Sequence, residues 1–115
     1  MDKALKKKWV KALRSGDYEQ TTCALRVGDG FCCLGVLADI QGATWKHDGS
    51  GRDVYEAWFG PLRVSSIGSV HTRSGEATGQ ELGGLSCVAA NLLTRMNDVL
   101  NKDFEEIADA IEKYF

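Results

Sequence analysis

The sequence predicts one small α+β domain that is mainly helical, with about four helices and a short antiparallel hairpin or sheet. Apolar residues recur at helical spacing in both terminal parts of the 115-residue chain, and two short apolar runs flank a Gly-Asp-Gly turn. A chain of this length has room for one hydrophobic core. We therefore expect residues 1–115 to form a single domain, with a glycine-rich, loop-rich insert at about 42–84.

The first predicted helix covers residues 2–15, because Leu5, Trp9 and Leu13 share one face and Gly16 ends the pattern. Residues 1–14 carry six basic side chains and one acid, whereas residues 98–115 carry six acids and two lysines. The basic face is either a solvated surface or a contact for phosphate or an acidic partner. The opposite charges also predict that the two ends attract, within one chain or between chains.

A β-hairpin is predicted next, with strands at 24–27 and 31–33 and a turn at 28–30 whose Asp-Gly pair suits positive φ. Residues 33–40 then follow as a helix that is apolar on nearly all sides. We expect Gly35 in this helix to permit close approach of a neighbouring element, and Gly42 to end it.

The middle of the chain has a weaker pattern, and nine of the 13 glycines fall within residues 42–84. Asp53 as a cap and Gly60-Pro61 as a stop predict one or two helical turns over residues 53–59. Residues 62–64 and 67–72 are strand candidates.

Two helices are predicted after the insert. The first has a core-facing row, Ser86 as its cap and Asn97-Asp98 as its stop; the row comprises Leu85, Val88, Ala89, Leu92, Leu93 and Met96. Asp103 and Glu106 form a capping box for the second. Its predicted buried face comprises Phe104, Ile107, Ala108 and Ile111, and Tyr114 and Phe115 extend the apolar surface.

The cysteines indicate a reducing compartment. No export signal or membrane-spanning stretch is evident, so we expect a cytoplasmic protein with reduced thiols at Cys23, Cys32, Cys33 and Cys87. Their spacing lacks the paired Cys-x-x-Cys pattern of zinc sites, and the chain has neither a phosphate-binding loop nor a helical histidine pair. The sequence therefore predicts no metal and no cofactor. A net charge of −2 argues against bulk nucleic-acid binding.

Two parts of the chain resemble a group of small uncharacterised proteins of bacteriophages and prophages. The first part lies within Trp9–Ile40 and includes Ala24-Leu25-Arg26 and Phe31-Cys32-Cys33-Leu34-Gly35-Val36-Leu37; the second is Asn97-Asp98 with Phe104-Glu105-Glu106-Ile107-Ala108-Asp109 and Ile111-Glu112. The resemblance implies a phage accessory protein that acts in the host cytoplasm and is dispensable for particle structure, but it implies no activity. Cys23 stands where this group is expected to have glycine, and the middle segment has no counterpart.

The middle segment also contains the residues suited to recognition. Flat aromatic rings and cations in loops can stack a base and neutralise phosphates, and the candidate residues are Trp45, His47, Arg52, Trp58, Arg63, His71 and Arg73. Trp45 and Trp58 can instead simply close the core of a small domain. We therefore expect a non-enzymatic binding protein that aids host takeover or evasion of host defence, with a small nucleotide-like ligand and a possible homo-oligomer.

Two alternatives stay open at this point. The chain can block a host protein by direct contact, without a small ligand. It can also be a cysteine hydrolase that uses Cys32, at the start of a helix, with His71 as the base, because a helix N-terminus lowers the pKa of a thiol.

Overall fold

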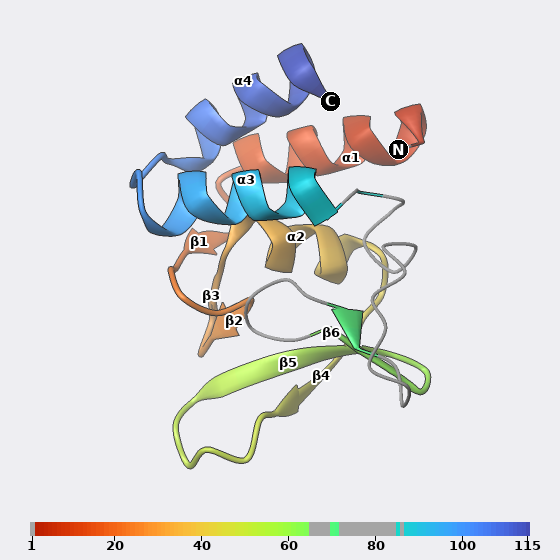
Figure 1. Ribbon diagram of the computed structural model, residues 1–115, viewed down its shortest axis with the longest axis vertical. Helices are drawn as coiled ribbons and strands as arrows, with labels where there is room; N and C mark the ends of the chain where they lie inside the picture. The colour runs from red at the N-terminus through yellow and green to blue at the C-terminus, as the bar shows by residue number, and fades with distance from the viewer. Residues whose placement is uncertain (1, 65–69, 72–84, 86) are drawn as a thin grey trace.

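The computed structural model describes residues 2–64, 70–71, 85 and 87–115. A mixed β-sheet forms one layer and the helices lie against one of its faces (Figure 1). Helix α2 lies next to the sheet, α1 and α3 pack on α2, and α4 is outermost against α1 and α3. The α+β class is therefore confirmed, although the sheet has a larger share than a mainly helical domain implies.

Four helices are described, and each coincides with a predicted one. They are α1 (Lys3–Arg14), α2 (Cys33–Ile40), α3 (Cys87–Asp98) and α4 (Phe104–Tyr114). Asp2 caps α1 by accepting a hydrogen bond from the Leu5 backbone N–H at 2.9 Å. The predicted capping box of α4 is also present, because Asp103 and Glu106 bond to each other's backbone N–H. Local capping chemistry thus fixes these helix starts.

The sheet contains seven strands among the described residues, most of them short. They are β1 (Glu19–Gln20), β2 (Arg26–Val27), β3 (Gly30–Phe31), β4 (Thr44–His47), β5 (Val54–Phe59), β6 (Leu62–Val64) and β7 (Val70–His71). The order is β1-β3-β2-β5-β6-β7, with β4 on the other edge of β5. Only the β1–β3 pair is parallel among these strands. The predicted hairpin is confirmed as β2–β3, and the predicted strand at 62–64 is β6.

The prediction of helical turns over residues 53–59 is wrong, because this segment is β5, the longest described strand. Tyr55 and Ala57 lie on one face of the sheet and Glu56 on the other, which is a two-residue period. Val54, Tyr55, Trp58 and Phe59 are residue types that favour strands, and β5 bonds to partners along both edges. Strand β7 lies within the other predicted strand, 67–72; the rest of that strand lies outside the described residues.

Helix α3 buries a narrower face than predicted. Leu85, which precedes it, is buried with Ala89 and Leu93, but Val88 is 80% exposed and Leu92 is 48% exposed. A buried row with one residue in four leads from Leu85 to Asn97, which lies inside the helix and is 1% exposed, and Ala90 is buried beside this row. The prediction that Val88 and Leu92 face the core is therefore wrong, because α2 and α4 cover one side of α3. Ser86, the predicted cap, lies outside the described residues.

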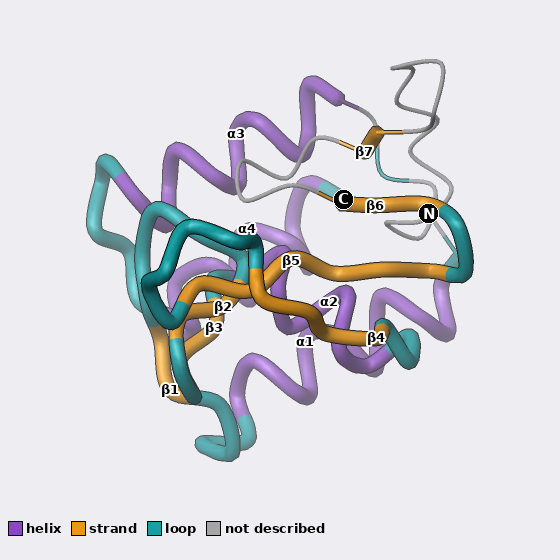
Figure 2. The backbone as a smooth tube through the Cα atoms, turned by 90° about the horizontal axis from the view of Figure 1, so that it is seen from below, coloured by secondary structure: helices purple, strands orange, loops and turns teal. Residues whose placement is uncertain are grey.

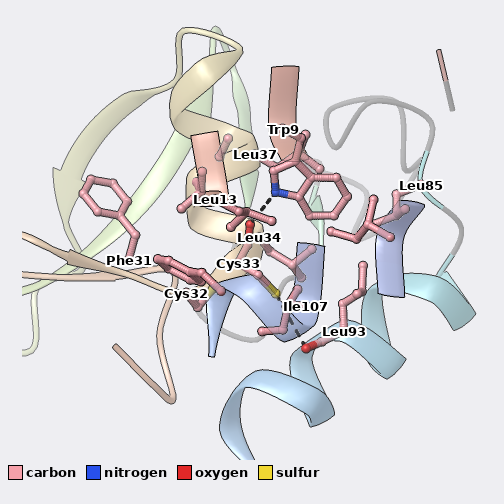
Figure 3. Packing of buried hydrophobic residues seen from close by; sticks show 14 of the residues in the cluster. Trp9, Leu13, Phe31, Cys32, Cys33, Leu34, Leu37, Leu85, Leu93 and Ile107 are labelled. Carbon is pink, nitrogen blue, oxygen red and sulfur yellow. Dashed lines mark hydrogen bonds between the residues drawn. The ribbon is translucent and has the colours of Figure 1, made fainter. Parts of the chain in front are cut away.

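The core gathers around the first turn of α2 (Figure 3). The indole Nε1–H of Trp9 donates a hydrogen bond to the Cys33 carbonyl at 2.9 Å, and the Cys33 thiol approaches the Leu93 carbonyl at 3.6 Å. Trp9, Cys33 and Leu93 are all 0% exposed. The three helices α1, α2 and α3 are thus joined by polar contacts inside an apolar cluster.

The predicted attraction between the ends is confirmed within one chain. Arg14 of α1 forms ion pairs with Glu105, at 3.4 Å, and with Asp109 and Glu112 of α4. The acidic carboxylates beside it raise the pKa of Arg14 further above its usual value. All partners are largely exposed, so this network aligns α1 with α4 more than it stabilises the fold.

The predicted close approach at Gly35 is also confirmed. A Cβ atom at Gly35 would lie 2.9 Å from the Leu25 carbonyl carbon and closer still to its oxygen. The Leu25 oxygen already accepts a hydrogen bond from the Cys32 N–H at 3.0 Å. Because backbone meets backbone there, α2 lies against the β2 segment only if residue 35 has no side chain.

We expect Gly35→Ala to lower the free energy of unfolding by about 3 kcal/mol, the upper part of the range for overpacking. Chemical denaturation measures this value. The control Gly16→Ala changes a glycine at φ +79° with open space around it, so only backbone strain of about 1 kcal/mol is expected. A loss below that of Gly16→Ala would contradict the close approach.

Cys23 provides a second prediction, because this exposed non-glycine residue has φ +66°. The left-handed conformation is strained for a side chain with a Cβ atom. Cys23→Gly should therefore raise the free energy of unfolding by about 1 kcal/mol. Cys23→Ser keeps the Cβ atom and removes the thiol, so its stability should stay close to that of the parent. Equal stabilisation by both variants would show that the thiol, and not the backbone, is responsible.

Candidate functional site

The seven residues predicted to bind a ligand do not form one cluster. The β4–β5 register pairs Trp45 with Ala57 and His47 with Tyr55, which places Trp45 and His47 on the face that packs towards α2. Trp58 and Arg63 are paired on the opposite face. His71 stands opposite Arg63 in the β6–β7 register, Arg52 lies in the loop between β4 and β5, and Arg73 lies outside the described residues.

Trp45 is held by polar and aromatic contacts within the fold. Its Nε1–H donates to Asp39 Oδ1 at 2.9 Å, and the Tyr18 hydroxyl donates to Asp39 Oδ2 at 2.6 Å. Its ring meets the edge of Phe31 at a centroid distance of 5.6 Å. Trp45 therefore joins β4 to α2, which favours the core-closing interpretation for this tryptophan.

Arg26 is a central residue that the sequence reasoning missed. Its guanidinium carbon lies 4.4 Å from the ring centroid of Tyr55, 5.3 Å from that of Phe31 and 5.7 Å from that of Trp45. Its Nε donates to the Gly28 carbonyl at 2.7 Å. A cation among three rings ties β2, β3, β4 and β5 together. The signal in the sequence was an arginine in one strand of the predicted hairpin, opposite the aromatic residue Phe31 in the other strand.

A cavity of about 510 Å³ lies at the end of the β4–β5 hairpin. The loop of this hairpin is at the lower edge of the molecule in Figure 1. Its lining residues are His47, Gly49, Gly51, Arg52 and Asp53. The loop is shaped by Gly49 at φ +87° and Gly51 at φ +82°, and by Asp48, which accepts a hydrogen bond from the Ser50 N–H at 2.8 Å. The hydrogen bonds from Ser50 also lower the pKa of Asp48. The turn is therefore built by its own side chains.

The cavity presents a ring, a cation and a carboxylate. His47 lies on Tyr55 with centroids 4.2 Å apart, and its Nε2 is 3.9 Å from Asp53 Oδ1. Desolvation, and then a hydrogen bond to the Asp53 carboxylate, raise the pKa of Tyr55. The Arg52 guanidinium makes no hydrogen bond or ion pair with the described residues, and only its backbone N–H is engaged, with Ser50 Oγ at 3.3 Å. This arrangement is suited to binding a polar, flat, anionic molecule.

The opposite face of the sheet carries a second cluster, and Figure 2 shows the strands in front of α1 and α2. Lys46 Nζ lies 4.7 Å from the ring centroid of Trp58. Glu56 accepts hydrogen bonds at 3.3 Å from both Trp58 Nε1 and Arg63 Nη1. The charges of this cluster are thus partly neutralised by Glu56, in contrast to the guanidinium of Arg52 at the cavity.

The surroundings of Cys32 and Cys33 suppress the reactivity of their thiols. Cys32 caps α2, and its sulfur accepts a hydrogen bond from the Gly35 N–H at 3.3 Å. Burial nevertheless raises the pKa of the Cys32 thiol to about 12, and burial also raises that of Cys33. A thiol nucleophile requires a lowered pKa, so the hydrolase alternative loses its main physical support. Within the described residues, no group of three or more histidine, cysteine, aspartate or glutamate side chains is placed to hold a metal ion.

These raised pKa values predict a loss of stability at alkaline pH. Unfolding exposes Cys32, whose ordinary pKa is 9.0, and Tyr18, whose ordinary pKa is 10.0, whereas both have pKa values of about 12 in the folded chain. The unfolded state therefore binds fewer protons between these limits, and stability falls as the pH rises from about 9 towards 12. Denaturation curves measured across this range check the expectation, and stability that stays constant above pH 9 would contradict it.

Iodoacetamide labelling tests the burial directly. Near neutral pH, the exposed Cys23 should react, and Cys32 and Cys33 should react only after denaturation. Peptide mass spectrometry identifies the labelled positions. Rapid labelling of Cys32 in the folded protein would restore the hydrolase alternative.

Sequence reasoning identified His47 and Arg52 but missed Asp53 and Tyr55 as their neighbours. The reason is that the helical prediction for residues 53–59 gives this segment no register with β4, whereas the β4–β5 pairing places Tyr55 opposite His47. The signal was present as two glycines in a short polar loop between segments with alternating side chains, which is typical of a hairpin.

Comparisons with known proteins identify a family and nothing closer. Every helix in the part of the chain that the structure describes is too short or too polar to cross a bilayer. Neither the curated proteins nor the solved structures contain a match. A family model described as a domain of unknown function, DUF8296, matches residues 1–115. The chain therefore belongs to the DUF8296 family.

Proposed function

We propose that this chain is a binding protein, not a catalyst, and that it holds a small nucleotide-like ligand at the cavity of the β4–β5 hairpin. The observation that carries the proposal is the unpaired guanidinium of Arg52 beside the exposed ring of His47 at a cavity of about 510 Å³. Concave sites with a few convergent polar groups are where small ligands generally bind.

Each group at the cavity has a role in this proposal. The His47 ring is backed by Tyr55 on one side and offers its other face for stacking a base. Arg52 supplies a planar fork of N–H donors for a phosphate. Asp53 supplies an acceptor for a ribose hydroxyl or an exocyclic amine, and Gly49 and Gly51 allow the ligand to approach the backbone.

The resemblance to small phage proteins supplies the biological setting of the proposal. A protein that binds a nucleotide signal without converting it lowers the free concentration of that signal. Sequestration of this kind would help a phage to take over its host or to evade host defence. The action depends on affinity and on the number of copies made, so no catalytic group is needed.

A second candidate function is the blockade of a host protein by direct contact. The observation that favours it is the Lys46, Trp58 and Arg63 cluster on the face of the sheet opposite α2. Tryptophan and arginine are enriched among residues that dominate protein interfaces. This candidate uses a different face from the hairpin cavity, so substitutions separate the two.

Thermal melting tests the proposal with three probes: a cyclic dinucleotide, a cyclic trinucleotide and ADP-ribose. A ligand at about 100 times its Kd adds about 2.7 kcal/mol to the stability, which raises the Tm by several degrees. We expect at least one probe to do so and Arg52→Ala to abolish the shift. Arg63→Ala is the control, because its guanidinium lies on the other face and pairs with Glu56.

Two results would contradict the proposal. One is the absence of a shift with all three probes. The other is a shift that survives Arg52→Ala but is lost in Arg63→Ala, which would place the ligand on the opposite face. Binding to a host protein that is lost in Trp58→Ala and kept in Arg52→Ala would favour the second candidate.

A further inference from the structure

Helix α1 carries its charges against the usual preference of a helix. A helix N-terminus has a partial positive charge and favours acidic side chains. Asp2 caps α1, but the first turn itself contains no acid, and Lys3, Lys6 and Lys7 occupy the N-terminal half of the helix. Lys3 and Lys7 are also like charges four residues apart, as are Lys7 and Lys11. Each of these placements destabilises the free helix.

Helix α4 shows that the same chain can satisfy this preference. It has Glu105 and Glu106 in its first turn and Lys113 in its last turn. Helices α2 and α3 also lack an acid in the first turn, but among the four described helices only α1 has lysines in its N-terminal half, and five lysines fall between residues 3 and 11.

The positive charges of the α1 lysines are not neutralised by ion pairs with the described residues of the fold. The acids of α4 that face α1 pair with Arg14, at the far end of the helix. Lys6 Nζ lies 3.5 Å from the Glu112 carbonyl oxygen. Within the part of the chain that the structure describes, the ammonium groups of Lys3, Lys7, Lys8 and Lys11 make no hydrogen bond or ion pair.

Three of these lysines line a groove of about 470 Å³, together with Val10 and Glu112. Val10 is 6% exposed, which makes it an apolar floor, and the aliphatic stems of the lysines add to the apolar wall. The residues that line the groove belong to α1 and α4, whereas those that line the hairpin cavity belong to β4 and the β4–β5 loop. Figure 1 shows these two parts at opposite ends of the molecule. The two sites share no residue.

We propose that the groove lined by Lys3, Lys6, Lys7 and Val10 docks an acidic, partly apolar segment of a partner protein. Carboxylates of the partner pair with the ammonium groups, and an apolar side chain covers Val10. This pairing also relieves the repulsion along α1 and the unfavourable charge at its N-terminus. A phosphate chain fits less well, because the groove has no arginine fork and has an apolar floor at Val10.

The probe is a labelled peptide of about twelve residues, a little over three helical turns, with glutamates and leucines on adjacent helix faces. Fluorescence anisotropy should show binding that weakens as salt is added. Lys7→Glu should reduce the affinity about tenfold or more, because it replaces an attraction by a repulsion. The matched control Lys8→Glu makes the same change of charge at the next position, which does not line the groove, and should reduce it less than about threefold.

The melting temperature of the free variants gives a second measurement. Lys7→Glu should melt at the parent temperature or above it, because an acid in the N-terminal half of a helix is favourable. A lower Tm would show that Lys7 serves folding and would overturn the proposal. Equal losses of affinity in Lys7→Glu and Lys8→Glu would also overturn it, since net charge alone would then explain binding.

A single-stranded DNA oligonucleotide of similar charge separates the partner classes. Binding of the peptide in preference to the oligonucleotide supports the proposal. Binding of the oligonucleotide in preference to the peptide would replace it with a nucleic-acid interface.

Discussion

The buried side-chain amide of Asn97 is the interaction on which the rest of the structure depends. Its Oδ1 accepts hydrogen bonds from Gln20 Nε2 at 2.9 Å and from the Cys33 N–H at 3.3 Å, and its Nδ2 donates to the Thr21 carbonyl at 2.8 Å. One side chain thus joins the end of α3 to the first turn of α2 and to the β1 segment. A buried amide is stable only when its partners are in place, so this contact fixes the three elements in one arrangement.

The position of α2 then determines the position of the hairpin cavity. At the start of α2, Gly35 lies against the Leu25 backbone. Strand β2 begins directly after Leu25 and places Arg26 among the aromatic rings of the sheet. Near the other end of α2, Asp39 accepts a hydrogen bond from Trp45 of β4. Both strands of the β4–β5 hairpin are therefore held from the same helix. The loop between them, which carries Arg52, is exposed but has rigid supports on both sides.

The net charge of −2 does not show how charge is arranged on the helical side and on the sheet side of the molecule. Arg14 forms ion pairs with three acids of α4, so the lysines of α1 on the helical side have no ion pair with those carboxylates. On the sheet side, Glu56 partly neutralises Arg63, whereas the guanidinium of Arg52 makes no hydrogen bond or ion pair with the described residues. Cations without an ion pair to any described residue thus remain at two concave places: Arg52 at the hairpin cavity, beside the Asp53 carboxylate, and Lys3, Lys6 and Lys7 at the groove that α1 and α4 line.

The sequence by itself determined the four described helices and the capping box of α4, because these depend on residues within a few positions of one another. It predicted the close approach at Gly35 as well, since a glycine in an apolar helix leaves room for a neighbouring backbone. It also predicted the attraction between the ends, since charge acts without detailed geometry. Only the tertiary structure decided that residues 53–59 form a strand, that Val88 and Leu92 are exposed, and that Trp45 is structural whereas His47 and Arg52 share a cavity. Strand register and burial are set by partners far away in the chain, and a single sequence does not contain those pairings explicitly.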